Sequence, residues 1–295
     1  MSLVINHNLM AMNAARNLGV SYGNLETSTR RLSSGLRITQ SSDDAAGLAV
    51  RELMRSDISS LQQGIRNAND AISLIQTADG ALGVIDEKLI RMKELAMQAS
   101  TGTYNSDQRL IIDSEYQAMA SEITRIASST DFNGIYLLNG ALSASTHDGS
   151  ALKATGKLKV HFGTGNDSAE DYYYVQINTA TASALGVGLS AGGTAGRSIS
   201  TQQLAQQSLD VLNKAIISKD KIRANLGSLQ NRLENTVTVL EIQAENVQAA
   251  ESRISDVDVA TEMTEFVRNQ ILTQSAVSML AQANSMPRMA LSLLG

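Results

Sequence analysis

The chain has 295 residues, with one proline, no tryptophan and no cysteine. The lack of cysteine excludes disulfide bridges, thiolate catalysis and cysteine metal sites, and a net charge of only −5 makes nucleic acid an unsuitable partner. The sequence holds no apolar run of the length, about 18 residues, that a membrane-spanning helix needs. Its first basic residue is Arg16, so we expect no cleaved secretory signal.

The first predicted element is a helix within residues 1–43. Its stripe recurs in steps of four and three residues and comprises Ala11, Ala15, Leu18, Tyr22, Leu25, Thr29, Leu32 and Leu36. This spacing places the residues on one face of a helix. Because Asn8 and Thr29 make the stripe polar, it buries little apolar surface to offset the entropy of ordering the chain. We therefore expect this helix to need neighbours in order to fold.

Residues 44–99 form the second predicted helix and residues 106–130 a shorter third one. The second stripe runs through Ile58, Leu61, Ile65, Ala68, Ile72, Ile75, Ala78, Leu82, Ile85, Leu89, Met92, Ala96 and Ala99. Its extra three-residue step from Ile75 to Ala78 is a stammer, which locally overwinds a coiled coil. The third stripe consists of Ile112, Tyr116, Met119, Ile123 and Ile126. Together they predict a long helix packed against a shorter one.

The middle of the chain, 139–197, is rich in Gly, Ser, Thr and Ala. Apolar and polar residues alternate in 157–162 and again in 172–178, which predicts two half-buried strands and a β-hairpin over 157–178. We expect its apolar face to cover the groove that the short third helix leaves open. The stretches 140–156 and 180–197 are interpreted as flexible connections.

In the second half of the chain, the pattern predicts a long helix over 200–255. Its stripe consists of Leu204, Val211, Ala215, Ile222, Leu226, Leu229, Leu233, Thr236, Leu240, Val247, Ala250 and Ile254, with a four-residue slip between Ile222 and Leu226. The helices 44–99 and 200–255 match in length, each roughly 80 Å at ~1.5 Å per residue. The sequence thus predicts a mainly α fold, a long antiparallel bundle or coiled-coil rod with a small hairpin.

The last segment, 255–295, carries another thin stripe. It combines Met263, Val267, Val277 and Ala281 with the polar residues Gln270, Gln274 and Asn284. We expect it to pair with the N-terminal helix. Leu291, Leu293 and Leu294 follow Pro287 and have nothing to bury against in one subunit, which suggests contacts with other subunits.

Sequence signals for a nucleotide-binding, metal-binding or catalytic site are weak along the whole chain. The run 186–192, GVGLSAG, fits a loose nucleotide-binding pattern, but a linker is the better interpretation because no second βαβ unit follows. Three acidic residues, Asp167, Glu170 and Asp171, lack the spacing of a calcium loop and are better explained as a solvated turn. The histidines His7, His147 and His161 have no catalytic partners at motif spacing. We expect no enzyme activity, no cofactor and no metal.

Five stretches carry a family resemblance: INHNLMAMNAARNL (5–18), LSSGLRI (32–38), SSDDAAGLAV (41–50), DFNGIYLLNG (131–140) and PRMALSLLG (287–295). In these the chain resembles bacterial flagellin. The resemblance implies a self-assembling structural subunit of the motility filament. Residues 1–43 with 255–295 would form its inner core, and 44–180 with 197–254 its helical rod, with no real outer domain. A hook–filament junction protein or another coiled-coil adaptor remains the alternative.

The resemblance also implies partners and a location. The subunit would leave the cell through the flagellar type III exporter, without a cleaved signal, and would lie in the extracellular flagellum. A flagellin export chaperone would hold its C-terminal segment, and filament-cap and hook-junction proteins would contact the polymer. We expect Leu18, Leu25, Leu32, Met263, Val267, Leu291, Leu293 and Leu294 to support polymerisation.

A short stretch resembles the helical motif by which Toll-like receptor 5 senses flagellins. The stretch is IRMKELAMQ (90–98), and the resemblance assigns receptor binding to Arg91, Leu95 and Glu115. Two positions depart from the motif, since Ile90 stands where many such flagellins have Gln, and Lys93 where they have Arg. Innate immune recognition is therefore expected in addition to assembly.

Overall fold

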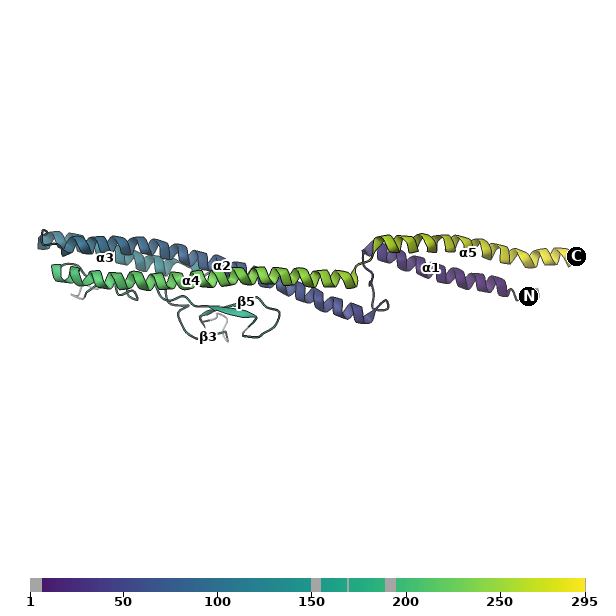
Figure 1. The fold of residues 1–295 in the computed structure, drawn as a ribbon, viewed down its shortest axis with the longest axis horizontal. Coiled ribbons are helices and arrows are strands. Elements are labelled where there is room, and N and C mark those ends of the chain that lie inside the picture. Colours follow the sequence, from purple (N-terminus) through teal and green to yellow (C-terminus); the bar gives the residue numbers. More distant parts are fainter. Residues whose placement is uncertain (1–6, 150–154, 169, 189–194, 295) are drawn as a thin grey trace. The chain divides into compact units, whose positions relative to one another are not determined.

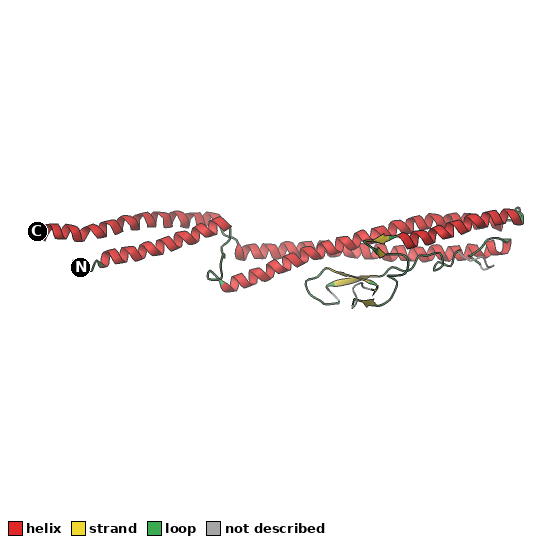
Figure 2. Cartoon of the chain, turned by 180° about the vertical axis from the view of Figure 1, so that it is seen from behind, coloured by secondary structure: helices red, strands yellow, loops and turns green. Residues whose placement is uncertain are grey.

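The computed structural model describes residues 7–149, 155–168, 170–188 and 195–294. The helices are α1 (Leu9–Ser34), α2 (Ala45–Ser100), α3 (Ser106–Ser129), α4 (Gln202–Ser255) and α5 (Val259–Leu294). The strands are β1 (Asp131–Phe132), β2 (Ile135–Tyr136), β3 (His147–Asp148), β4 (Thr155–Gly156), β5 (Leu158–His161) and β6 (Tyr172–Val175) (Figure 2). They form three antiparallel pairs, β1 with β2, β3 with β4 and β5 with β6. The mainly α fold is confirmed, and the three central helices begin and end within two residues of the predicted positions.

The chain divides into two compact units. The terminal unit comprises Met1–Ile58 with Glu245–Gly295, and the rod unit comprises Ser59–Ala244. The boundaries between the units fall within α2 and within α4, so each of these helices contributes to both units. Within the described part of the chain, none of the helices combines the length and apolar character that a membrane-spanning segment requires.

Polar residues fix where the helices begin. The Asn8 side chain accepts a hydrogen bond from the first turn of α1, and Asp44 does the same for α2 at 2.9 Å. Asn105 and Gln108 form a reciprocal capping box at the start of α3, with bonds of 2.8 and 3.0 Å. Asp258 accepts from the first turn of α5. Each cap satisfies backbone N–H groups that a helix start leaves unpaired.

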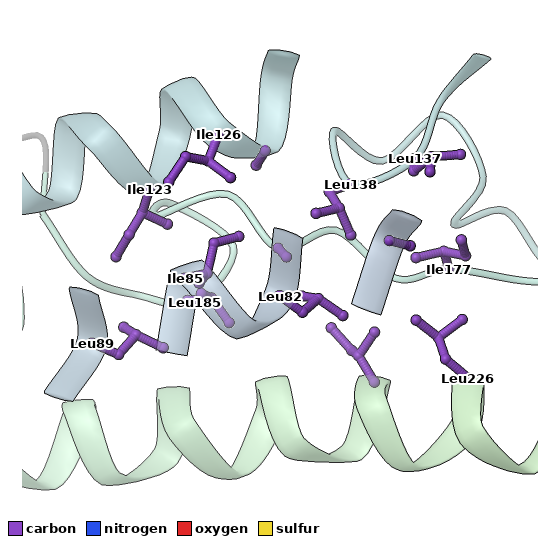
Figure 3. Close-up of a cluster of buried hydrophobic side chains, with 14 of the residues drawn as sticks. Leu82, Ile85, Leu89, Ile123, Ile126, Leu137, Leu138, Ile177, Leu185 and Leu226 are labelled. Carbon is purple, nitrogen blue, oxygen red and sulfur yellow. The ribbon is translucent and has the colours of Figure 1, made fainter. Parts of the chain in front are cut away.

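The rod unit has an apolar core between three helices, α2, α3 and α4, which lie side by side (Figure 1). In Figure 3, Leu82, Ile85 and Leu89 of α2 lie between α3 and α4. All three are fully buried. At about 1.5–3 kcal/mol for each fully buried apolar side chain, this core supplies the driving force for folding the unit.

The buried stripe of α2 is more regular than predicted. It runs in unbroken steps of three and four residues through Leu61, Gly64, Ala68, Ala71, Ile75, Ala78, Leu82, Ile85, Leu89, Met92, Ala96 and Ala99. The predicted stammer is therefore wrong, because Gly64 and Ala71 occupy the positions that we had assigned to their larger neighbours Ile65 and Ile72. The hairpin requires the small residue, since a Cβ at position 64 would lie 2.0 Å from the carbonyl oxygen of Phe162.

The predicted slip in the α4 stripe is wrong for a similar reason. The buried positions continue at regular spacing through Ser208, Leu212, Ala215, Lys219, Ile222 and Leu226. Two of them are polar, so an apolar pattern could not register them. Lys219 is only 1 % exposed.

The predicted hairpin is confirmed, with β5 and β6 paired antiparallel in the register Leu158↔Val175 and Val160↔Tyr173. Val160 and Val175 are buried in the core of the rod unit. The hairpin docks on α2, where Asn67 donates a hydrogen bond of 2.9 Å to the carbonyl of His161. It also meets α4, where the Arg232 guanidinium lies 3.9 Å from the centre of the Tyr173 ring. The hairpin thus covers the groove beside α2 and α4, as expected.

The segment after the hairpin packs against the core, which corrects the expectation of a flexible connection for residues 180–188. Ala180, Ala182, Leu185 and Val187 are all buried. Near the end of the predicted connection, the chain is held to α3, because the Tyr116 hydroxyl donates a 2.7 Å hydrogen bond to the carbonyl of Gly196. Burial of the phenol raises the pKa of Tyr116. Residues 150–154 and 189–194 of the two predicted connections lie outside the described residues.

In the terminal unit, α1 and α5 run antiparallel, and residues 35–44 tie them to the ends of α2 and α4. The Arg37 backbone donates to the carbonyl of Ser255 at 2.6 Å. Asp43 accepts hydrogen bonds from the backbone and hydroxyl of Thr39 at 3.1 and 2.9 Å and lies 3.4 Å from Arg30. Chiefly because of the Thr39 hydroxyl, the pKa of the Asp43 carboxyl is lowered. The stretch SSDDAAG therefore forms a hydrogen-bonded turn followed by a helix cap.

Candidate assembly surface

The contact between α1 and α5, here called the terminal seam, mixes half-buried leucines and a phenylalanine with small and polar side chains. Its less exposed positions are Ala11, Ala14, Leu18, Ser21, Leu25, Ser28 and Leu32 on α1, and Glu262, Phe266, Asn269, Thr273, Ala276, Leu280 and Ala283 on α5. Of these, Ser28, Asn269, Thr273 and Ala283 are buried. Three of the four are polar, so the most deeply buried positions of the seam contribute little apolar burial.

The predicted α1 stripe is correct at Ala11, Leu18, Leu25 and Leu32, and the remaining predictions in the seam are one residue off. On α1, Ala15, Tyr22 and Thr29 are exposed, and the adjacent residues 14, 21 and 28 face α5 instead. All seven predicted α5 positions are likewise exposed, each one residue beyond a seam position: Met263, Val267, Gln270, Gln274, Val277, Ala281 and Asn284. On α5 the large apolar residues were the wrong guide, because smaller or polar residues such as Asn269, Thr273 and Ala276 take the positions that face α1.

The polymerisation residues expected from sequence therefore fall into three groups. Leu18, Leu25 and Leu32 are half-buried in the terminal seam and hold α1 to α5. Met263 and Val267 point away from it and are each 45 % exposed. For the third group, Leu291, Leu293 and Leu294, the backbone continues α5 through Pro287, and the side chains lie outside the described residues.

Outside the seam, large apolar side chains are exposed on both helices. This outer apolar face consists of Leu9, Met10, Met12, Val20 and Tyr22 on α1, and Val259, Met263, Val267, Ile271, Leu272, Val277, Met279 and Met289 on α5, each 45–64 % exposed. Sequence reasoning had placed several of these residues inside the pair. Exposed apolar residues in such number mark a contact surface rather than the ordinary exterior of a soluble protein.

Polar contacts of the pair are sparse. Asn8 donates a 2.7 Å hydrogen bond to the carbonyl of Ala283, and Arg31 lies 3.5 Å from Glu262. The buried hydroxyl of Thr273 has no hydrogen-bond partner within the described part of the chain. An unsatisfied buried hydroxyl costs about 1–3 kcal/mol. The pair is therefore weakly held from within, while its apolar face is left outside.

A second exposed site lies on the rod unit, where α2 meets α3. Arg91 donates to Glu115 through two nitrogens, at 3.0 and 2.8 Å, and to Glu94 at 2.9 Å. These bonds, above all the one to Glu115, raise the pKa of Arg91. Leu95, which the motif resemblance assigned to receptor binding, is 1 % exposed and belongs to the core. An ion pair thus lies at the surface, Leu95 is buried in the core and not available at that surface, and Glu94 is a member of the ion-pair cluster that the sequence did not indicate.

Several of the acidic and histidine residues considered as candidate sites from the sequence make contacts that hold the fold together. The Asp171 carboxylate accepts backbone hydrogen bonds at 2.7 and 3.3 Å inside the hairpin turn. A ring nitrogen of His147 lies 2.8 Å from the carbonyl oxygen of Lys157, and the His161 ring lies beside that of Tyr172, with 5.9 Å between the ring centres. His7 is exposed at the start of the described chain. Gly186 and Gly188 adopt positive φ angles, whereas Ala191 lies outside the described residues. Among the described residues, no group of His, Asp and Glu could hold a metal ion.

Comparisons with known proteins agree over nearly the whole chain. Residues 5–143 match the bacterial flagellin N-terminal helical region, and residues 209–294 match the bacterial flagellin C-terminal helical region. The chain is 42 % identical over 292 residues to "Flagellin FlaB2" of Treponema pallidum, covering 99 % of this chain and 100 % of that protein. It is 41 % identical over 292 residues to the flagellin of Halalkalibacterium halodurans, with the same coverage.

A solved structure supports the architecture independently. The fold is similar to that of a putative flagellar hook-associated protein from Vibrio parahaemolyticus, with a TM-score of 0.55 at 14 % identity, covering 72 % of this chain and 100 % of that one. At this identity the likeness concerns the fold alone.

Proposed function

The chain belongs to the bacterial flagellin family and is a structural subunit of the flagellar filament, not an enzyme, and on this premise we propose how it assembles and what else binds it. The outer apolar face of α1 and α5 is the surface through which subunits pack into the filament core. The observation that carries this proposal is that the most deeply buried positions of the terminal seam are mostly polar, while many large apolar side chains of α1 and α5 are exposed. Neighbouring subunits would remove that apolar surface from water.

The test replaces Met263 and Val267 together by Ser and follows seeded filament growth by light scattering. Each side chain contributes about 1.5–3 kcal/mol when fully buried, so the double variant should lose elongation while the rod unit keeps its thermal transition. Elongation at the wild-type rate would contradict the proposal. Thr264→Ala, at an exposed polar position on the same helix, is the control and should elongate normally.

The three C-terminal leucines provide a second test of the same surface. Truncation after Met289 removes Leu291, Leu293 and Leu294, and we expect it to abolish elongation with the rod unit still folded. A truncated protein that extends seeds normally would show that this terminus is a dispensable tail.

The exposed Arg91–Glu115 pair is proposed to bind Toll-like receptor 5. What supports this is the motif resemblance together with the exposure of the pair, 48 % for the Arg91 side chain and 44 % for that of Glu115. Arg91→Ala or Glu115→Ala should weaken receptor binding by about 2 kcal/mol or more, as expected for a charged interface anchor.

The matched control is Arg125→Ala. It breaks another exposed ion pair, with Glu122 on α3, at 2.6 Å. Binding titrations should use monomeric protein with unchanged helical circular dichroism. If the Arg91, Glu115 and Arg125 variants all bind like wild type, the motif match is coincidental.

The same exposed apolar surface would be available to other partners before the subunit assembles. We propose that an export chaperone covers the apolar side of α5 before assembly, and that filament-cap and hook-junction proteins contact the same terminal unit in the extracellular flagellum. The Met263 and Val267 double Ser variant should then also bind the chaperone more weakly, which a pull-down with purified chaperone would measure.

A further inference from the structure

Lys219 is a charged residue at a core position of the rod unit. It lies in the buried stripe of α4 between Ala215 and Ile222 and is 1 % exposed. Its ammonium group lies 2.6 Å from a carboxylate oxygen of Asp86 on α2 and 2.6 Å from one of Asp220 on its own helix. An apolar residue at this position would extend the core without having to bury a charge, so the lysine calls for an explanation.

A second ion pair connects the same two helices one turn further along α4. Arg223 donates to both carboxylate oxygens of Asp79 at 2.7 and 3.0 Å, a bidentate arrangement that fixes direction as well as distance. The hydrogen bonds from Arg223 lower the pKa of Asp79. Two separate charge pairs thus join α2 to α4 near the middle of the rod.

The apolar stripes alone leave the axial alignment of α2 and α4 poorly specified. Both repeat with the same alternation of three- and four-residue steps, so sliding one helix by seven residues again matches stripe to stripe. Many α2 stripe positions are alanine, namely Ala68, Ala71, Ala78, Ala96 and Ala99. Such small side chains fit against many partners and discriminate little between alignments.

The charges do discriminate. A seven-residue slide in one direction moves Lys219 from Asp86 to Asp79, and Arg223 from Asp79 to the apolar Ile72. The opposite slide brings Lys219 to Lys93, which leaves its buried ammonium group against a like charge. Only the observed alignment satisfies both pairs. The first slide loses the partly exposed Arg223–Asp79 pair, whereas the opposite slide breaks the Lys219–Asp86 pair, whose ammonium group is buried, and that loss is the more unfavourable one.

We propose that Lys219, through Asp86, sets the register of α2 against α4. A single polar or lysine residue at a core position is known to specify register in coiled coils, at some cost in stability. In a polymer every subunit must present the same surface at the same height. A slide of seven residues would displace the α4 surface by about 10.5 Å, at 1.5 Å per residue.

The test measures register directly. Because the sequence has no cysteine, Val84→Cys on α2 and Ile217→Cys on α4 provide two unique sites for spin labels, both at exposed positions. Double electron–electron resonance should give one narrow distance distribution in the otherwise wild-type protein. With Lys219→Met it should give additional distances, consistent with an axial displacement of about 10.5 Å. A single unchanged distance in that variant would overturn the proposal.

Two further variants keep the test decisive. Lys221→Met removes an exposed charge from the same helix and should keep the single distance. The exchange Asp86→Lys with Lys219→Glu restores a pair of opposite charge and should return the single distance seen in wild type. If Lys219→Met does not fold, the exchange decides, since a folded exchange variant with several distances would contradict register control by this pair.

Discussion

The two units of this chain use the same helical periodicity in opposite ways. In the rod unit the stripe positions carry large apolar residues such as Leu82 and Leu89, which are fully buried. In the terminal unit the buried positions carry Asn269 and Thr273, while apolar residues such as Val267 are exposed. The rod therefore has the core of a self-sufficient fold, whereas the terminal pair requires other subunits to cover its apolar face. Apolar residues buried within the subunit indicate a helix that is stable in the monomer, and apolar residues left exposed indicate a helix that is stabilised by contacts with other subunits.

The largest expected effect comes from shortening an apolar side chain in each unit. Leu89→Ala should destabilise the monomeric rod by about 2–5 kcal/mol, because it leaves a cavity in a core that cannot collapse fully. Val267→Ala should change monomer stability far less, by about 0.5 kcal/mol, because nearly half of this residue is already exposed to water and the change leaves no closed cavity. Urea denaturation of the two monomers measures both. Equal losses of stability would remove the distinction between the units.

The next effect concerns glycines of α2. Gly64→Ala would place a Cβ 2.0 Å from the Phe162 carbonyl oxygen, so the hairpin must shift, at a cost of about 1–3 kcal/mol. Gly80→Ala meets no atom within 4 Å and should stabilise the helix by up to about 1 kcal/mol. Thermal melting gives the opposite signs, and faster hydrogen exchange in β5 and β6 should accompany only the first change.

A smaller effect is expected in the terminal seam. Thr273→Val keeps the side-chain shape but removes the unpartnered hydroxyl, and should stabilise the α1–α5 pair by about 1 kcal/mol. Limited proteolysis of the monomer should then cut the terminal helices more slowly. The wild-type monomer is expected to lose roughly residues 1–40 and 256–295 first, leaving a fragment near 44–255. Terminal helices that resist protease as well as the rod does would contradict the weakness inferred for the seam.

The smallest effect depends on pH. The pKa of Asp43 is below its ordinary value of 3.8 in the folded chain, mainly through the Thr39 hydroxyl. A carboxyl whose pKa is depressed by folding stabilises the fold above its unfolded pKa, and this contribution is lost as pH falls through the folded pKa. Asp43→Asn should therefore lower the stability of the terminal unit at pH 7 but have little effect near pH 2. Chemical denaturation at both pH values is the measurement, and an equal loss at the two would contradict this role.

Much of the fold could be predicted because it depends on local features of the chain. A three-and-four periodicity marked the long helices, and alternating residues marked the hairpin strands. Capping residues such as Asn105 and Asp44 fixed where helices begin. These signals act within a few residues, so the sequence by itself determined the helices and the two strands of the hairpin.

Tertiary structure decided which of two adjacent residues faces inward. Gly64 replaces Ile65 in the α2 stripe because the hairpin backbone approaches closely, and Thr273 rather than the adjacent Gln274 faces α1. Lys219 enters the core because Asp86 lies opposite, on a helix more than a hundred residues away in sequence. Adjacent helix positions differ by only about 100° around the axis. The choice between them depends on the distance and charge of the opposing element, which no local pattern of apolar residues encodes.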